Sequence, residues 1–151
     1  MADPNDMVSL WMIGYEDEPH RSAEICIFEI FGRDVGPDGA RVGMGLHPFG
    51  DPGIREDFER VPVTADVRGW HDYAAEWTTE WVAFYVDDQL MKVVGQSPAY
   101  PMQLMIGIYE FVDDVWPASP PAAYPKTFEV RSFRGYRPSG TTALARGSAA
   151  S

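Results

Sequence analysis

The chain of 151 residues fits a single domain, and 45% of its residues are hydrophobic, enough for a substantial core. Its formal net charge of −11 argues against nucleic acid or an anionic membrane surface as the main partner. No stretch approaches the ~20 apolar residues that a membrane-spanning helix needs.

Cysteine and histidine usage narrows the possible chemistry. Cys26 is the only cysteine, so no internal disulfide can form. His20, His47 and His71 lack the spacing of metal ligands, and we predict no metal site and no cofactor. The first ten residues, MADPNDMVSL, show no secretory signal, which leaves the compartment open.

The order of apolar runs and turn residues predicts an all-β fold. Short runs rich in Val, Ile, Phe, Tyr and Trp alternate with Gly, Pro and Asp clusters, at the spacing of an antiparallel sandwich or barrel. VDDQL at 86–90 predicts a hairpin turn, and GDPGIREDFER at 50–60 predicts a polar loop with room for one helical turn. The expected strands lie near 7–14, 23–31, 40–47, 70–77, 81–87, 90–94, 101–110 and 127–136.

Two further segments read as connections. DDVWPASPPAAYP at 113–125 predicts a long Pro-rich loop, and long ordered loops are often functional. The small, polar C-terminal stretch predicts a disordered tail at 139–151, following one domain over residues 1–138.

The residues RSAEICIFEIFGRD place Glu24 and Glu29 in an otherwise apolar strand. Strict alternation would point Glu29 into the core, where an unpaired carboxylate is costly. One β-bulge near Ile27 and Phe28 would return Glu29 to the face that carries Glu24 and Cys26. The spacing therefore predicts two carboxylates on one open face; the alternative is two surface charges that happen to be neighbours.

Two later strands also have one apolar face and one open face. In 40–47, apolar residues alternate with small ones and a histidine, which would leave space above the sheet for a ligand. In 101–110, the even-numbered residues from Met102 to Ile108 are apolar, and the opposite face includes Tyr109. The open faces in 40–47 and 101–110 carry Gly43, Gly45, His47, Gln103, Met105, Gly107 and Tyr109.

The order and spacing of these segments resemble glycoside hydrolase family 16, the laminarinase-like branch of the concanavalin A-like lectin/glucanase fold. EICIFE at 24–29 is similar to the family's Glu-x-Asp-x-x-Glu signature, with Cys26 in place of Asp. Other similar segments, between about residues 7 and 138, are WMIGY, VGMGLHPFG, WHDYAAEWTTEWVAFYVDDQLMKVV, YPMQLMIGIYEF and FEVRSFRGYRP. The resemblance implies an antiparallel jelly-roll β-sandwich with a concave cleft face.

The resemblance also implies a reaction: retaining, endo-acting cleavage of β-glycosidic bonds in a polysaccharide such as a β-1,3-glucan. Glu24 would be the nucleophile and Glu29 the general acid and base, with their carboxyl groups about 5–5.5 Å apart. The pKa of Glu29 would be raised while Glu24 stays ionised. Cys26 stands where the family's middle acid hydrogen-bonds the nucleophile, and a neutral thiol donates only weakly there.

Four other residues are candidates for contact with the polysaccharide. His47 shares its face with two glycines, and Tyr109 faces the cleft by parity. Trp11 lies beside the glutamate strand and Trp116 lies on the long loop, where their rings would stack on sugar faces. The expected partner is a polysaccharide, with no nucleic acid or membrane.

Two departures from the family pattern leave other hypotheses open. One is Cys26; the other is that strands which normally precede the segment around Trp11 are absent. A sandwich without them would expose apolar surface and unpaired backbone, and it could self-associate through its sheet edges. The rival hypotheses are a non-catalytic carbohydrate-binding module and an incomplete, inactive chain.

Overall fold

The computed structural model describes residues 3–15, 17–112 and 117–137; Trp116 and the predicted tail at 139–151 lie outside them. Within these residues all regular structure is antiparallel strand, apart from two 3₁₀ turns, which confirms the predicted all-β sandwich. No helix in this part of the chain is long and apolar enough to cross a membrane. The strands are β1 (Asp6–Gly14), β2 (Glu24–Phe31), β3 (Val35–Gly36), β4 (Gly39–His47), β5 (Asp57–Val63), β6 (Tyr73–Trp77), β7 (Val82–Val86), β8 (Gln89–Val94) and β9 (Met102–Glu110).

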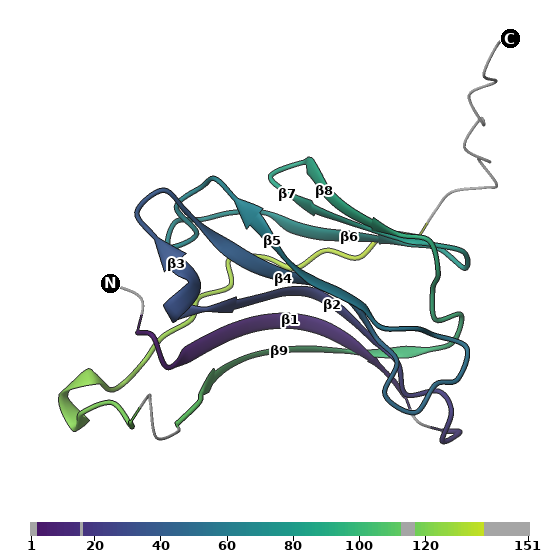
Figure 1. Cartoon of the computed structure of the whole chain (residues 1–151), viewed down its shortest axis with the longest axis horizontal. Helices are drawn as coiled ribbons and strands as arrows, with labels where there is room; N and C mark the ends of the chain where they lie inside the picture. The colour runs from purple at the N-terminus through teal and green to yellow at the C-terminus, as the bar shows by residue number, and fades with distance from the viewer. Residues whose placement is uncertain (1–2, 16, 113–116, 138–151) are drawn as a thin grey trace, which may run out of the picture.

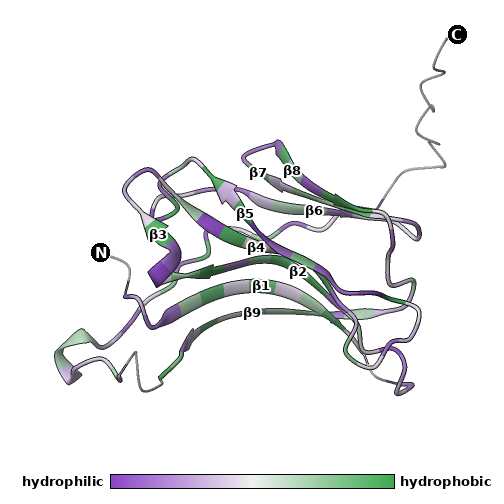
Figure 2. Ribbon diagram, in the orientation of Figure 1, coloured by the Kyte–Doolittle hydropathy of each residue, from purple (hydrophilic) through white to green (hydrophobic). Residues whose placement is uncertain are grey.

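The strands form two layers of unequal size (Figure 1). A six-stranded sheet runs in the order β3-β4-β2-β1-β9, with β5 paired to β4, and a three-stranded sheet runs β6-β7-β8. The large sheet is arched, and the small sheet lies over its convex side, so the concave side faces away from it (Figure 1). Figure 2 shows hydrophobic residues concentrated in the strands.

The core lies between the two sheets and is built from alternate residues of each strand. Fully buried core residues are Ile25, Val42, Met44, Leu46, Val82, Phe84 and Val94. Burying an apolar side chain of this size contributes ~1.5–3 kcal/mol relative to leaving it exposed.

At the edge of the sandwich formed by β5 and β8, Lys92 donates to Asp57 at 2.8 Å and to Glu59 at 2.9 Å.

Two expectations about strands are wrong. The predicted loop at 50–60 contains the start of β5, which pairs with β4 over Asp57–Val63. Because β5 is an edge strand, it tolerates charged residues and Pro62, which make the sequence look like a loop. The segment 127–136 is apolar enough for a strand but forms none, since no described strand pairs with its backbone.

The predicted hairpin turn at 86–90 is confirmed. It joins β7 to β8, and Asp87 and Asp88 take positive φ angles of 48° and 63°. Two consecutive residues in the left-handed region match the right-handed twist of the flanking strands, and Asp is among the residues that adopt it.

Asp87 also holds His71, and this pair predicts a pH dependence of stability. His71 Nδ1 lies 2.7 Å from Asp87, and its other ring nitrogen lies 2.8 Å from the carbonyl of Asp66. The hydrogen bond to Asp87 raises the pKa of His71 above 6.5, and the same bond lowers the pKa of Asp87 below 3.8. The pair therefore stabilises the fold fully between about pH 4 and 6.5.

Above pH 6.5 this stabilisation is lost as His71 deprotonates, and at low pH it is lost as Asp87 protonates. We expect His71→Gln to destabilise by roughly 0.5–1 kcal/mol near pH 6 and by less near pH 9. Thermal unfolding of both proteins between pH 5 and 9 measures this. A destabilisation that grows with increasing pH would contradict the assignment.

Candidate active site

A bulge in β2 changes which way its side chains point. Against β1, Phe28 is opposite Leu10 and Cys26 is opposite Trp11, so Ile27 has no opposite residue. Ile27 and Phe28 both belong to the hydrophobic core cluster, whereas consecutive residues of a regular strand point to opposite faces. The predicted bulge is therefore present at the predicted position.

The same irregularity appears against β4 on the other side. Cys26 is opposite Gly45 and Glu29 is opposite Gly43, so β2 advances three residues where β4 advances two. The extra residue resets the alternation, and Glu24, Cys26 and Glu29 all line one pocket. The bulge thus brings the two carboxylates to the same face without placing either in the core.

This pocket has a volume of about 250 Å³ and lies on the face of the large sheet that points away from the core. It brings together the predicted residues Glu24, Cys26, Glu29, Trp11 and Tyr109. His47 is not in its lining, although its backbone is opposite Glu24 in β4. The lining residues that sequence analysis did not single out are Met7, Ser9 and Phe111.

The space expected above Gly43 and Gly45 is not an open groove. A Cβ on Gly43 would lie 2.5 Å from the ring of Phe58, because that ring fills the space. Gly45 has φ +142°, and a Cβ there would lie 2.1 Å from the carbonyl of Asp57. The expectation from the Gly-Gly-His face is therefore wrong: these glycines allow close approach of β5.

His47 lies at the margin of the pocket in a defined setting. Its Nδ1 lies 2.8 Å from a carboxylate oxygen of Glu56, and its ring centre lies 4.4 Å from that of Phe58. Sequence analysis does not single out Glu56 and Phe58, because their region has the composition of a polar loop. The alternation of Phe58 with charged residues in DFERVPV was the signal that could have identified them.

Burial raises the pKa of both glutamates. For Glu24 the positive charge of His47 opposes this effect, and the negative charge of Glu29 adds to it. For Glu29, His47 and Arg60 both oppose the effect of burial. The two pKa values are therefore shifted in the same direction, and the expected contrast between a raised Glu29 and an unshifted Glu24 is not found in this structure.

Cys26 lies between the glutamates as a neutral thiol. Its side chain is buried, and burial together with the two negative charges raises its pKa. Its sulfur lies 4.0 Å from the carbonyl of Gly43, a weak contact with the backbone of β4. Cys26 is therefore neutral at this position and is only a weak hydrogen-bond donor.

A row of aromatic rings extends from the glutamates along the concave side. The ring centres of Trp11 and Tyr109 are 5.9 Å apart, and those of Tyr109 and Phe111 are 6.4 Å apart. Phe111 continues to Phe31 at 5.7 Å, and the guanidinium of Arg33 lies over the Phe31 ring. Phe31 is buried, but Tyr109 and Phe111 are 41% and 45% exposed and offer flat apolar surfaces near the two carboxylates, an arrangement suited to an extended ligand.

Comparison with known proteins identifies the family. The model of the family "Glycosyl hydrolases family 16" matches residues 7–130, most of the chain. The chain belongs to this family. The family assignment agrees with the antiparallel sandwich and with the resemblance of the motifs. No curated protein matches the chain.

Two solved structures are similar to the chain. The GlcNAcα1-4Gal-releasing endo-β-galactosidase from Clostridium perfringens is 28% identical with a TM-score of 0.61, covering 76% of this chain and 31% of that one. LamAcat from Zobellia galactanivorans is 17% identical with a TM-score of 0.52, covering 78% of this chain and 53% of that one. The chain therefore spans less than two thirds of the length of either structure.

Proposed function

We propose that this chain is a retaining, endo-acting glycoside hydrolase that cleaves β-glycosidic bonds of a polysaccharide. The observation that carries the proposal is the bulge in β2, which puts Glu24 and Glu29 in one pocket on the open face. Two carboxyl groups that flank a glycosidic bond are the minimal requirement of this chemistry. Membership of glycosyl hydrolases family 16 supports the same reaction class.

In the proposed reaction Glu24 is the nucleophile and Glu29 the proton donor. The Glu24 carboxylate attacks the anomeric carbon while Glu29 gives its proton to the leaving glycosidic oxygen, which forms a glycosyl-enzyme ester. Glu29, now ionised, then takes a proton from water as the water attacks the anomeric carbon and releases Glu24. Burial raises the pKa of Glu29, which favours the protonated form that the first step needs, but it also raises the pKa of Glu24, which opposes the ionised form of the nucleophile.

We propose that Trp11 and Tyr109 bind sugar rings, as they stand beside the glutamates in the pocket lining. His47 would act from the margin, where it is close enough to influence the charge of both glutamates. For the substrate we propose a β-1,3-glucan, with a β-galactoside glycan as a second candidate. The similarity to an endo-β-galactosidase at 28% identity favours testing the second.

The test is the release of reducing ends from laminarin, lichenan and a β-galactoside glycan by the purified chain. The first product, followed by proton NMR of its anomeric signal, should keep the β configuration. A folded protein that releases nothing from any of the three substrates would overturn the proposal. An initial α product would overturn the retaining mechanism and leave hydrolysis standing.

Replacing Cys26 with Asp should increase turnover. A protonated Asp between the glutamates donates a strong hydrogen bond to the Glu24 carboxylate, whereas the thiol makes only a weak contact with the backbone. We expect roughly a tenfold increase, the value of one hydrogen bond to a charged group. Cys26→Val is the matched control, since valine has a similar size and no hydrogen-bond donor. Equal rates for the Asp and Val variants would argue against this role.

A carbohydrate-binding module without turnover is the second candidate. The neutral, buried thiol of Cys26 favours it, because the nucleophile lacks the acidic neighbour that the family signature provides. In this case the chain would bind laminarin or a β-galactoside glycan without cleaving it, and Glu24→Gln would leave the affinity unchanged. Isothermal titration of both proteins distinguishes binding alone from catalysis.

A further inference from the structure

Ser9 brings a polar group without a partner into the lining of the glutamate pocket. The residue is 3% exposed, and its hydroxyl makes no hydrogen bond to any described residue. A buried hydroxyl without a partner costs free energy, so its presence calls for a physical reason. Of the buried side-chain atoms that lack a partner among the described residues, the Ser9 hydroxyl alone belongs to this lining.

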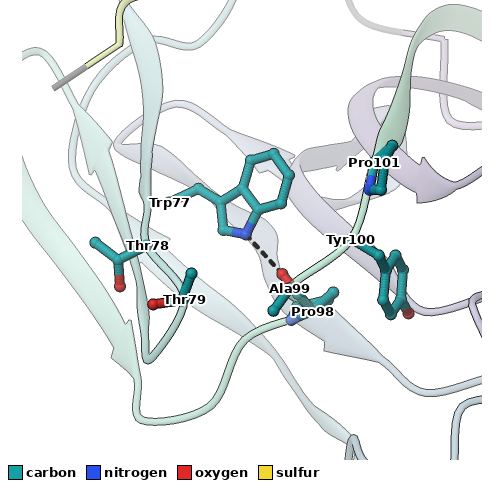
Figure 3. Close-up of a pocket in the computed structure, with 7 residues that line it drawn as sticks. All are labelled: Trp77, Thr78, Thr79, Pro98, Ala99, Tyr100 and Pro101. Atoms are coloured by element: carbon teal, nitrogen blue, oxygen red, sulfur yellow. Dashed lines mark hydrogen bonds between the residues drawn. The ribbon is translucent and has the colours of Figure 1, made fainter.

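A second pocket, between the end of β6 and the start of β9, offers no such group (Figure 3). Its walls include Trp77, whose indole donates to the Pro98 carbonyl at 2.9 Å, and Tyr100, which donates to Asp51 at 2.7 Å. Among the described residues, no buried side-chain atom without a partner lines this second pocket. The unpaired hydroxyl is therefore a feature of the pocket that holds the glutamates.

The register of β1 defines the neighbours of Ser9 within the sheet. Glu29 of β2 is opposite Ser9 on one side, and Gly107 of β9 is opposite it on the other. Directly opposite residues that share a face have Cβ atoms about 4.5–5.5 Å apart. Because Ser9 and Glu29 line the same pocket, the hydroxyl lies beside the Glu29 side chain. Glu24 is opposite Ile13, further along β1.

The ring of Tyr109 covers the other side of Ser9. A Cβ added to Gly107 would lie 3.0 Å from a carbon of this ring, so the ring occupies the space that a side chain at position 107 would fill. Ser9 is therefore enclosed between Tyr109 and Glu29, although it lies on the open face of the sheet. The strongest acceptor beside its hydroxyl is the carboxylate of Glu29, since hydrogen bonds to an ionised group are the stronger ones.

We propose that Ser9 is a positioning residue for Glu29, and that its hydroxyl donates a hydrogen bond to the Glu29 carboxylate when that group is ionised. The inference rests on the proposed function, in which Glu29 is first a proton donor and then a base. A hydroxyl rotates to suit its partner, and a glutamate side chain needs only a small rotation to reach it. The bond holds the ionised carboxylate in one orientation, ready to take a proton from water.

The other groups around Glu29 act on it through burial and charge. Burial raises the pKa of Glu29, the charges of His47 and Arg60 oppose this, and the charge of Asp34 adds to it. Strand β1 contributes no ionisable side chain to the pocket lining. The ionisable groups around Glu29 are Glu24 and Cys26 of β2, Asp34 of the following turn, His47 of β4, Arg60 of β5 and Tyr109 of β9.

The test is the pH titration of Glu29, followed by carbon-13 NMR of its side-chain carboxyl group and assigned with Glu29→Gln. A donor to the ionised form lowers the pKa of a carboxyl group, so its removal must raise it. We expect Ser9→Ala to move the midpoint to higher pH, by about tenfold in proton concentration, the value of one hydrogen bond to a charged group. Ser9→Thr keeps a hydroxyl and should restore the midpoint.

Ser22→Ala is the matched control. Ser22 is also a buried serine, 7% exposed, but its hydroxyl accepts from the Gly50 N–H at 2.9 Å and lies outside the pocket lining. This variant should lower the thermal stability and leave the Glu29 midpoint unchanged. An unchanged or lower midpoint in Ser9→Ala, or an equal rise in Ser22→Ala, would overturn the proposal.

Turnover gives a second measurement that separates this inference from the proposed function. The alkaline limb of kcat/KM follows the protonated form of Glu29, so Ser9→Ala should move that limb to higher pH by the same factor as the NMR midpoint. A chain that shows the NMR change but cleaves no polysaccharide would contradict the proposed function and support the bond between Ser9 and Glu29. A chain that cleaves with the same pH profile in both forms would overturn the role of Ser9.

Discussion

Glu24→Gln is expected to reduce polysaccharide cleavage at least about 10⁴-fold, because the amide cannot form the glycosyl ester. The substitution keeps the size of the side chain and removes its charge from a pocket where burial already raises the pKa of Glu24. The fold should therefore be at least as stable as that of the unaltered chain. The measurement is reducing-end release on the best substrate, with thermal unfolding as the check on folding.

The matched control for this loss is Glu80→Gln, since Glu80 is an exposed glutamate outside the pocket. It should leave turnover unchanged. Glu29→Gln distinguishes the proton donor from the nucleophile. It removes the proton donor and should slow the cleavage of substrates with poor leaving groups most. If Glu24→Gln keeps more than a few per cent of the activity, Glu24 is not the nucleophile.

Gly45→Ala is expected to destabilise the chain by about 2–4 kcal/mol, or to prevent folding. Two effects add. The residue has φ +142°, a conformation that alanine rarely adopts, and its new Cβ would lie 2.1 Å from the carbonyl of Asp57. To relieve the overlap, β5 must move away from β4, which also shifts Phe58 and with it the contact to His47.

Denaturant unfolding measures this loss, and Gly95→Ala is its control. A Cβ added to Gly95 would meet no described atom within 4 Å, and the φ of Gly95 is not in the left-handed region. Alanine there should change the free energy of unfolding by less than about 0.5 kcal/mol. If Gly45→Ala and Gly95→Ala lower the free energy of unfolding by similar amounts, the close approach of β5 to Gly45 is not the cause of the destabilisation.

The sequence was sufficient to predict the central strand of the candidate site. The five-residue spacing of Glu24 and Glu29 conflicts with the period of two, and a bulge is the simplest way to keep both out of the core. The structure has that bulge beside Ile27. Local alternation also identified the two faces of β9, because each face is defined by the strand itself.

The expectations that the structure overturns share a physical cause. Each concerns a position whose surroundings are set by residues far away in sequence. Whether Gly43 leaves an open space depends on Phe58, which reaches it from β5. Whether 127–136 is a strand depends on a partner strand for its backbone, and none is present among the described residues. Burial raises the pKa of Glu29 and the charges of His47 and Arg60 oppose this, and no local pattern in β2 indicates these two neighbours.

Strand β9 carries two surfaces on alternate residues, and this couples their evolution. Tyr109 faces the pocket of the glutamates, while its neighbour Ile108 points to the core side of the sheet, where it is 38% exposed. Among the described strands only β1 pairs with β9, so a single strand holds its register. One residue inserted into β9 would exchange the two sets, sending apolar groups into the pocket and the tyrosine to the core side of the sheet. Selection can therefore alter either surface by substitution, but insertions and deletions in this strand must leave both intact.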